Sequence, residues 1–281
     1  PRTLREAYLT LSRFTGSVKC GHTYGNFFNQ PDQVKQQVLD SPDKLPFTFS
    51  LIGDRMLVSQ SAFSGIAAGS EILEISGRPV PDILKDLMAL VKADGSNDGK
   101  RRYDLQVSGS GQFEAFDVYF PLLVPPANGA YAILVKGQTT PVSVSTITRS
   151  ERKSKLKISE SGDPVSDLWS NRILPDGTAY LKLGTFAIWK SKLELLTYVT
   201  PKPTKIEGAK KLIRFQKVPE SLRLYLNTWD PSFYDFSDRT RPAEDSMYTL
   251  LERSTPITIE PSALAFSGKV AALIDPGHSS A

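Results

Sequence analysis

Apolar residues recur at spacings of three and four in several stretches, the pattern of helices with one buried face. At the start of the chain this pattern predicts a helix over Arg2–Phe14, which Gly16 ends. Its apolar stripe consists of Leu4, Ala7, Tyr8, Leu11 and Phe14. Further helices are predicted over Pro31–Leu39, Pro81–Val91 and Ile188–Val199, and the first two of these start with a proline, which is favoured at the first helical position.

Alternating or continuous apolar runs between these helices predict strands. The first group of strands is Phe47–Ile52, Arg55–Val58, Glu71–Ile75, Leu105–Val107, Phe113–Phe120, Ala130–Val135 and Val142–Thr148. The second group is Thr178–Phe186, Lys210–Phe215 and Val270–Ile274. The last of these is a continuous apolar run, which is typical of a strand buried on both faces of a parallel sheet.

A polar stretch between the two groups, Glu151–Asp167, is interrupted by Gly162 and Pro164 and has the composition of a linker. We therefore place a domain boundary there. The predicted fold is a multidomain α+β or α/β protein. Its parts are a small helical segment over residues 1–45, a β-rich domain over 46–150 and an α/β core over 168–281.

The composition agrees with several domains, because 281 residues exceed the size at which one hydrophobic core usually stops growing. Apolar residues make up 40% and charged residues 23% of the chain, an ordinary globular balance. The net charge of +4 is small, and the densest basic pieces, Lys100–Arg102 and Arg149–Lys157, are interrupted and typical of solvated loops. These features argue against nucleic acid as a partner.

Other classes are disfavoured as well. One cysteine excludes an internal disulfide framework, and no apolar run reaches the ~18 residues of a membrane span. Two histidines and one cysteine are poor material for a zinc site, so neither a metal nor a cofactor is expected. The chain begins at Pro1 without a methionine, which indicates a trimmed polypeptide and leaves room for a removed export signal.

Two short segments carry candidate chemistry. Near the N-terminus, glycines on both sides of His22 permit tight turns and close approach of other groups. At the other end, the apolar run is followed by a Pro-Gly turn and two serines, and such a turn can present a serine hydroxyl at a sheet edge. An imidazole side chain ordinarily titrates near neutral pH, so a histidine is a suitable base for a serine nucleophile. Cys20 with His22 is a less favoured nucleophile–base pair, and His278 is a less favoured base.

The stretch Gly65–Val80, GIAAGSEILEISGRPV, resembles the core of PDZ domains, where such a pattern precedes a helix. Ser70 and Ser76 stand where that pattern usually has aspartate and asparagine. The resemblance implies a domain that binds a peptide by adding it as a strand to a sheet edge. A purely structural spacer is an open alternative.

The order of the pieces carries a wider resemblance. A helix leading into Gly-His-Thr, the PDZ-like segment, the strand Thr178–Phe186 (TAYLKLGTF) and a terminal strand running into Ser-Ser-Ala resemble the carboxyl-terminal processing peptidase and tricorn-core family of serine peptidases. The resemblance implies Ser279 as the nucleophile and His22 as the base, and the backbone N–H of Ser280 is a candidate oxyanion donor. It also implies peptides or unfolded proteins as substrates and a periplasmic or secreted location.

Two departures from the family pattern bear on activity. The stretch Pro201–Pro219 has Gly208 as its only glycine, where the family has a glycine-rich block that supplies a second oxyanion donor. The glutamate or lysine that follows the nucleophile in the family is missing as well. We therefore expect these 281 residues to be an incomplete and nearly inactive serine peptidase. The rival hypothesis is a non-catalytic peptide-binding protein with a PDZ-like domain and a degenerate peptidase fold.

Overall fold

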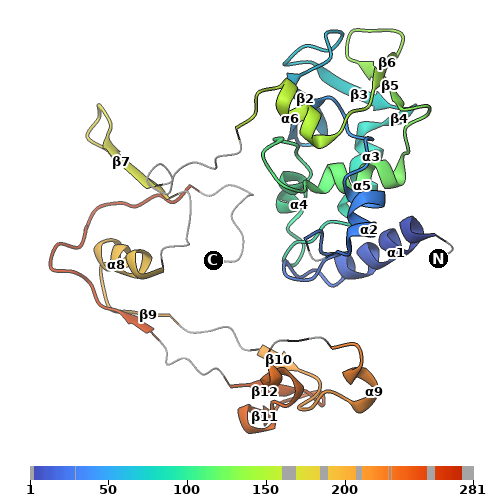
Figure 1. The fold of residues 1–281 in the computed structure, drawn as a ribbon. Coiled ribbons are helices and arrows are strands. Elements are labelled where there is room, and N and C mark those ends of the chain that lie inside the picture. The colour runs from blue at the N-terminus through green and yellow to red at the C-terminus, as the bar shows by residue number, and fades with distance from the viewer. Residues whose placement is uncertain are drawn as a thin grey trace. The chain divides into compact units, whose positions relative to one another are not determined.

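The computed structural model describes residues 3–28, 30–159, 169–183, 189–206, 211–226, 228, 230–251 and 257–273. The chain divides into two compact units, one of Pro1–Lys182 with Leu273–Ala281 and one of Leu183–Ala272. Helices and sheets are mixed in the described residues (Figure 1), and the strands of the largest sheet pair antiparallel. This mixture is that of an α+β fold. The boundaries of the three predicted domains stay predictions.

A six-stranded sheet forms the centre of the first unit, with the order β1-β2-β3-β5-β6 and with β4 beside β3. Its strands are β1 Phe47–Ile52, β2 Arg55–Ser61, β3 Glu71–Ile75, β4 Arg78–Pro79, β5 Ala130–Val135 and β6 Val142–Ser145. Five of them confirm predicted strands. Lys44, just before β1, exchanges two backbone hydrogen bonds with Ile147, just after β6, so the sheet curls until its edges meet.

The turn between β3 and β4 shows why this part of the chain was predictable. Ser76 and Gly77 both have left-handed backbone angles, φ 50° and φ 74°, as a two-residue hairpin turn requires. Glycine adopts such angles without steric cost, so the Ser-Gly pair suits this turn. The turn fixes the pairing of Ile75 with Arg78, and a register shift between Ile72 and Glu74 lets both Ile72 and Ile75 face the core.

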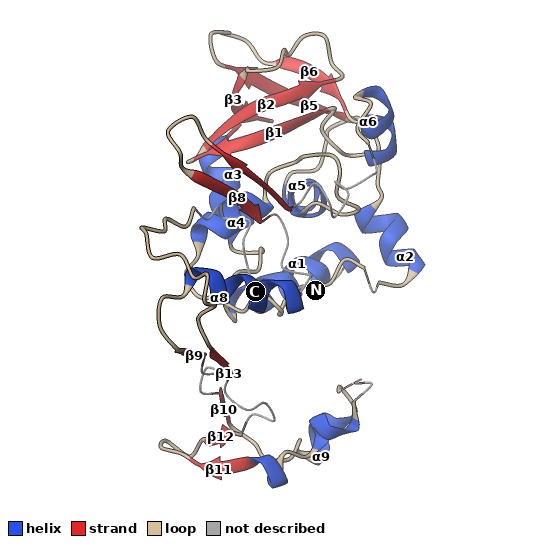
Figure 2. Cartoon of the chain, turned by 90° about the vertical axis from the view of Figure 1, so that its left-hand side faces the viewer, coloured by secondary structure: helices blue, strands red, loops and turns tan. Residues whose placement is uncertain are grey.

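The first unit also contains helices. They are α1 Leu4–Ser17, α2 Asp32–Val34, which continues into the π-helical turn Lys35–Leu39, α3 Val80–Met88, α4 Asp98–Asp104, α5 Ala115–Leu123 and α6 Arg149–Lys155. Helices α3 and α5 lie against the sheet (Figure 2). Their side chains Leu84, Leu87 and Phe116 are fully buried with Phe47 and Ile75 of the strands. Apolar contact between the sheet and these two helices therefore forms the core.

Helix α1 was predicted, but its end and its buried face differ from the prediction. Tyr8 is buried together with Ser12 and Gly16, whereas Leu11 and Phe14 are exposed. The helix continues through Gly16, because glycine here serves close packing. A Cβ at this position would lie 2.6 Å from the carbonyl oxygen of Ala89, so no larger residue fits.

The strand predicted over Phe113–Phe120 is wrong, since helix α5 occupies most of this stretch. The apolar–polar alternation of residues 116–120 was misleading because all five are buried. A helix buried all round has no polar face, so it lacks the helical period in its sequence. The strand predicted over Leu105–Val107 is also wrong. Only Val107 pairs, through an isolated bridge with Phe49, and Leu105 follows the unpredicted helix α4.

The first residues of the stretch predicted as a linker, 151–155, belong to helix α6 instead. Thr148 and Glu151 form a capping box, in which each side chain bonds the backbone N–H of the other residue. The helix buries Arg152 completely. Residues 160–167 of the predicted linker lie outside the described residues.

A hairpin follows, formed by β7 Trp169–Ile173 and β8 Ala179–Leu183. Strand β8 confirms a strand within Thr178–Phe186, and its side chains Tyr180 and Leu181 are 37% and 45% exposed. Gly177, with φ 83°, closes the turn.

The second unit contains short elements. They are the helices α8 Trp189–Val199 and α9 Glu220–Arg223, the 3₁₀ turns Pro231–Tyr234 and Ser237–Arg239, and the strands β9 Thr204–Ile206, β10 Lys211–Ile213, β11 Thr240–Pro242, β12 Tyr248–Leu250 and β13 Ile257–Ile259. Helix α8 and strand β10 confirm two predictions. The strands form a β10-β12-β11 sheet and a β13-β9 pair.

The terminal strand predicted over Val270–Ile274 is wrong in its described part. Residues 270–273 have no regular structure, and no described strand pairs with them. Val270 and Leu273 are 60% and 91% exposed. An apolar run forms a buried strand only where neighbouring strands complete its hydrogen bonds, and the described residues supply none here.

Candidate functional site

The predicted site residues divide into two groups. Ser279 and Ser280, as well as the alternative base His278, lie outside the described residues. His22 is described, and it lies with an exposed side chain in the turn that follows helix α1. The site is therefore built here from the surroundings of His22.

The chain turns sharply around His22. Lys19 has a left-handed φ of 55°, and the N–H of Thr23 donates to the carbonyl of Cys20 over 3.1 Å. The donor atoms of Cys20 and His22 lie within 4.8 Å of each other at this turn.

A third residue, Asp94, completes a cluster at this turn. Each of the three residues offers one donor atom: a sulfur from Cys20, a ring nitrogen from His22 and a carboxylate oxygen from Asp94. These three atoms all lie within 4.8 Å of one another. The sequence analysis considered the first two residues and missed the third. Asp94 lies in an Asp-Gly turn after helix α3, and no local pattern reveals which distant segment that turn contacts.

Three hydrogen bonds hold the two segments of the cluster together. The N–H of Gly21 donates to Oδ1 of Asp94 over 2.7 Å, and the N–H of Gly95 donates to the carbonyl of Lys19 over 2.8 Å. The Lys19 ammonium donates to Oγ of Ser96 over 3.2 Å. A Cβ at Gly21 would lie 2.9 Å from Oδ2 of Asp94, so glycine permits this close approach.

The thiol in this cluster has a lowered pKa. Hydrogen bonding from the Thr23 side chain, and then from the His22 backbone, lowers the pKa of Cys20 below its ordinary value. The thiolate is the form that binds metals and attacks electrophiles. The cluster therefore combines this thiol with an imidazole and a carboxylate.

Both segments continue into a large cleft of the first unit, about 910 Å³ in volume. Tyr24, Phe27 and Phe28 follow His22 and line the cleft, and Lys92 lines it two residues before Asp94. Strand β1, helix α4 and the start of α5 supply further walls. A cleft of this size with aromatic walls accommodates apolar side chains of a ligand.

Polar groups lie among the aromatic walls. The Lys92 ammonium lies 3.9 Å from the centroid of the Tyr24 ring, and Lys100 pairs with Asp104 across one turn of α4. Burial raises the pKa of Tyr119 to about 12, so its phenol stays neutral at ordinary pH. The cleft thus combines apolar surface with cationic groups.

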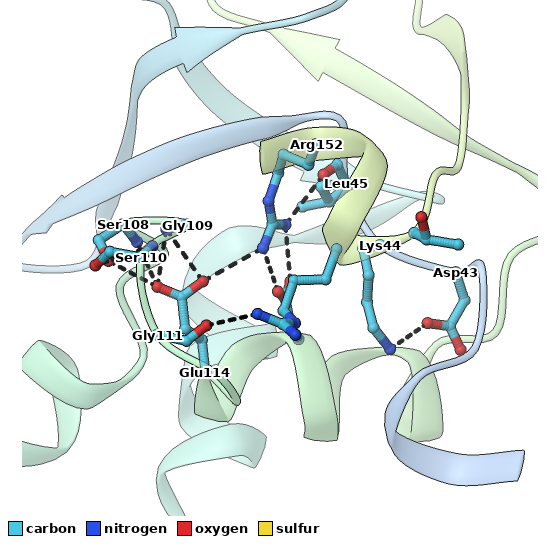
Figure 3. Close-up of polar contacts among 12 residues, drawn as sticks. Asp43, Lys44, Leu45, Ser108, Gly109, Ser110, Gly111, Glu114 and Arg152 are labelled. Atoms are coloured by element: carbon cyan, nitrogen blue, oxygen red, sulfur yellow. Dashed lines mark hydrogen bonds and ion pairs between the residues drawn. The ribbon is translucent and has the colours of Figure 1, made fainter. Parts of the chain in front are cut away.

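A buried ion network supports the wall of the cleft at Glu114 (Figure 3). Glu114 accepts from the N–H groups of Ser108 and Gly109 over 2.8 and 2.9 Å. Arg152 donates to Glu114 over 3.3 Å and to Asp117 over 3.0 Å. Burial raises the pKa of Glu114, and the Asp117 carboxylate adds to this effect. These contacts fix a loop, so we assign the network a structural role.

The outer edge of β1 is the place where the sheet could accept a further strand, but part of it is engaged. Phe49 exchanges two backbone hydrogen bonds with Val107, of 3.0 and 3.2 Å. The N–H of Leu51 donates to the side chain of Gln106 over 3.1 Å. A peptide adding to this edge would have to displace these contacts.

No helix in the described ranges is long and apolar enough to cross a membrane. No protein-family model matches the chain, and no curated protein sequence matches it either.

Proposed function

We propose that the chain is a serine-peptidase-like protein that hydrolyses peptide bonds, with Ser279 as the nucleophile and His22 as the general base. The observation that carries this proposal is the proximity of His22 to Asp94, a ring nitrogen and a carboxylate oxygen within 4.8 Å of each other, close in sequence to Tyr24 and Lys92 of the aromatic cleft. A histidine base needs a partner that holds its ring, and a carboxylate is the usual one.

Asp94 is suited to that role by its own hydrogen bond. Its Oδ1 accepts the Gly21 N–H, which fixes the carboxylate relative to the turn that carries His22. Its Oδ2 remains for the imidazole. In this role Asp94 holds one ring nitrogen, and the other nitrogen takes the proton of the serine hydroxyl. Asp94 then replaces the downstream acid whose absence the sequence analysis noted.

The cleft supplies a binding site for the substrate. A peptide needs its side chains anchored so that its carbonyl carbon is held against the nucleophile. The aromatic rings that line the cleft belong to Tyr24, Phe27 and Phe28, and the first of these residues follows His22 by two positions. These rings suit an apolar side chain of the substrate. We expect a preference for apolar or aromatic residues next to the cleaved bond.

The resemblance to PDZ domains supports the family assignment further. The PDZ-like stretch forms the hairpin of β3 and β4 and leads directly into helix α3, the order that such domains have. The alternative is a non-catalytic protein that binds a peptide as an added strand. Such binding is disfavoured at the edge of β1, because the backbones of Phe49 and Leu51 already have hydrogen-bond partners there.

Labelling of the full-length polypeptide with a fluorophosphonate probe tests the proposal. We expect one labelled site at Ser279, lost in Ser279→Ala. His22→Asn and Asp94→Asn should lower peptide hydrolysis, and loss of the orienting carboxylate alone costs about 10⁴-fold in such sites. His278→Asn is the matched control and should stay active.

Two results would overturn the proposal. One is an absence of labelling in the full-length polypeptide. The other is labelling or hydrolysis that persists in Ser279→Ala. Saturable binding of a fluorescent peptide without turnover would favour the peptide-binding alternative instead.

A further inference from the structure

We propose that Cys20, His22 and Asp94 form a binding site for a divalent transition-metal ion of the Zn²⁺ class. Their side chains offer a thiolate sulfur, an imidazole nitrogen and a carboxylate oxygen, which are the donors that such ions take. One donor atom of each residue lies within 4.8 Å of the other two. This inference goes beyond the proposed peptidase activity and does not depend on it.

The spacing of the donor atoms fits a tetrahedral site. Metal–ligand bonds of about 2.0–2.3 Å place tetrahedral donor atoms about 3.4–3.6 Å apart. The donor atoms lie within 4.8 Å of one another, at most about 1.2–1.4 Å beyond that spacing, a gap that rotations of the side chains of Cys20 and His22 close. Three protein ligands leave a fourth position for water, as in open zinc sites.

The backbone around the donors is fixed without a metal. Gly21 lies between two of the ligands, and its N–H holds Oδ1 of the third, Asp94, over 2.7 Å. Oδ2 of that carboxylate is left for an ion. The bond from Gly95 to the Lys19 carbonyl keeps the two segments in contact. Hydrogen bonds of this kind direct ligands and strengthen metal binding.

The charge and the softness of the donors select the type of ion. A thiolate and a carboxylate give two negative charges, which balance a divalent cation. The Lys19 ammonium, the cation next to Cys20 in the sequence, donates a hydrogen bond to Oγ of Ser96 over 3.2 Å. Magnesium and calcium ions require a shell of oxygen atoms, whereas sulfur and imidazole nitrogen favour zinc and related ions.

Titration of the full chain with Co²⁺ tests the site, because a bound thiolate gives a cobalt charge-transfer absorption band, and Zn²⁺ then displaces the cobalt. We expect saturation at one ion per chain and loss of the band in Cys20→Ser. His22→Asn and Asp94→Asn should weaken binding by more than about 100-fold, since even an outer-shell partner is worth about 10–100-fold. His278→Asn and Asp40→Asn are the matched controls and should bind as the unaltered chain does.

A second measurement separates lost binding from lost folding. All variants are melted in a chelator, where they should unfold as the unaltered chain does. Added Zn²⁺ should then raise the melting temperature of the unaltered chain, because the ion binds the native state, and leave that of Asp94→Asn unchanged. Absence of the thiolate band, or equal binding by Asp94→Asn, overturns the proposal.

The same residues could instead act as a cysteine nucleophile with its base and orienting acid. A peptidyl chloromethyl ketone distinguishes the two roles. Zn²⁺ at saturation should protect Cys20 from alkylation, and alkylation unaffected by Zn²⁺ contradicts the metal site. If the peptidase proposal also holds, Zn²⁺ should inhibit hydrolysis reversibly, because it occupies the imidazole of His22. Metal binding is read directly, so either proposal can fail alone.

Discussion

Arg152 is fully buried in the first unit and joins three parts of the chain through its guanidinium. It donates to Asp117 of helix α5, to Glu114 just before that helix and to the carbonyl of Leu45 before β1 (Figure 3). A buried charge is costly unless charged partners and hydrogen bonds compensate it. Arg152 therefore acts as a connection between α6, α5 and the start of the sheet.

Replacing Arg152 by methionine should destabilise the first unit strongly. The change leaves the carboxylates of Asp117 and Glu114 buried without their cation, and breaking a buried pair in this way costs about 3–5 kcal/mol. The free energy of unfolding in urea measures the loss. Arg102→Met is the matched control, because its pair with Asp54 is solvent-accessible and such pairs are worth less than about 1 kcal/mol. Equal losses in both variants would contradict the role of Arg152.

At the scale of elements, the sequence predicted those whose local signals agree with one another. Strand β3 is a short run rich in isoleucine and leucine, with a Ser-Gly turn at its end and a proline just before the following helix. Helix α5 has no such local signals. Its polar residue Asp117 is buried because it pairs with Arg152, which lies 35 positions later in the chain. Tertiary contacts thus decided the structure where the local pattern was ambiguous.

The candidate site shows the same division. Glycines around His22 marked a turn with candidate chemistry, and the turn is present. The contact with Asp94 spans 73 positions, as the hydrogen bond from Gly21 shows. A contact at such separation depends on how α1 and α3 pack, which includes the close approach at Gly16. It leaves no periodic trace in the sequence.

A cross-strand ion network ties three strands together on the outer face of the sheet. Glu71 on β3 pairs with Arg55 on β2 over 2.8 Å and with Lys136, just after β5, over 2.9 Å. The hydrogen bonds from Arg55 and then from Lys136 lower the pKa of Glu71 to about 2. A carboxylate with a depressed pKa stabilises the fold above its unfolded pKa, and this stabilisation is lost as the pH falls through the folded value.

Glu71→Gln should therefore destabilise the protein at neutral pH and make little difference in acid. The gap between the two urea midpoints should be constant above the ordinary glutamate pKa of 4.5 and shrink as the pH falls towards about 2. Urea unfolding at several pH values measures this gap. Glu74→Gln, on the same strand, is the control. A gap that stays constant down to the lowest pH would show that Glu71 contributes no ionic stabilisation.

At the scale of the whole molecule, the two units differ in how much apolar surface they bury. The buried apolar side chains of the described residues lie between Tyr8 and Ile147, with Ile259 as the exception. In the second unit, Leu224, Tyr225 and Leu264 are 90%, 82% and 80% exposed. Burial of apolar surface is the main favourable term in folding, so the stability of the described chain resides in its first part.

Residues 1–159 should consequently fold alone. This stretch contains the whole six-stranded sheet, the buried network of Arg152, the aromatic cleft and the cluster at His22, and its length is within the range of ordinary single domains. We expect a single cooperative thermal transition in circular dichroism and a dispersed amide spectrum. Residues 183–273, produced separately, are the comparison and should melt without a sharp transition, because few of their described side chains are buried. A non-cooperative melt of residues 1–159 would show that the core requires the rest of the chain. Cooperative folding would make this fragment the simplest protein in which to measure metal binding at Cys20, His22 and Asp94.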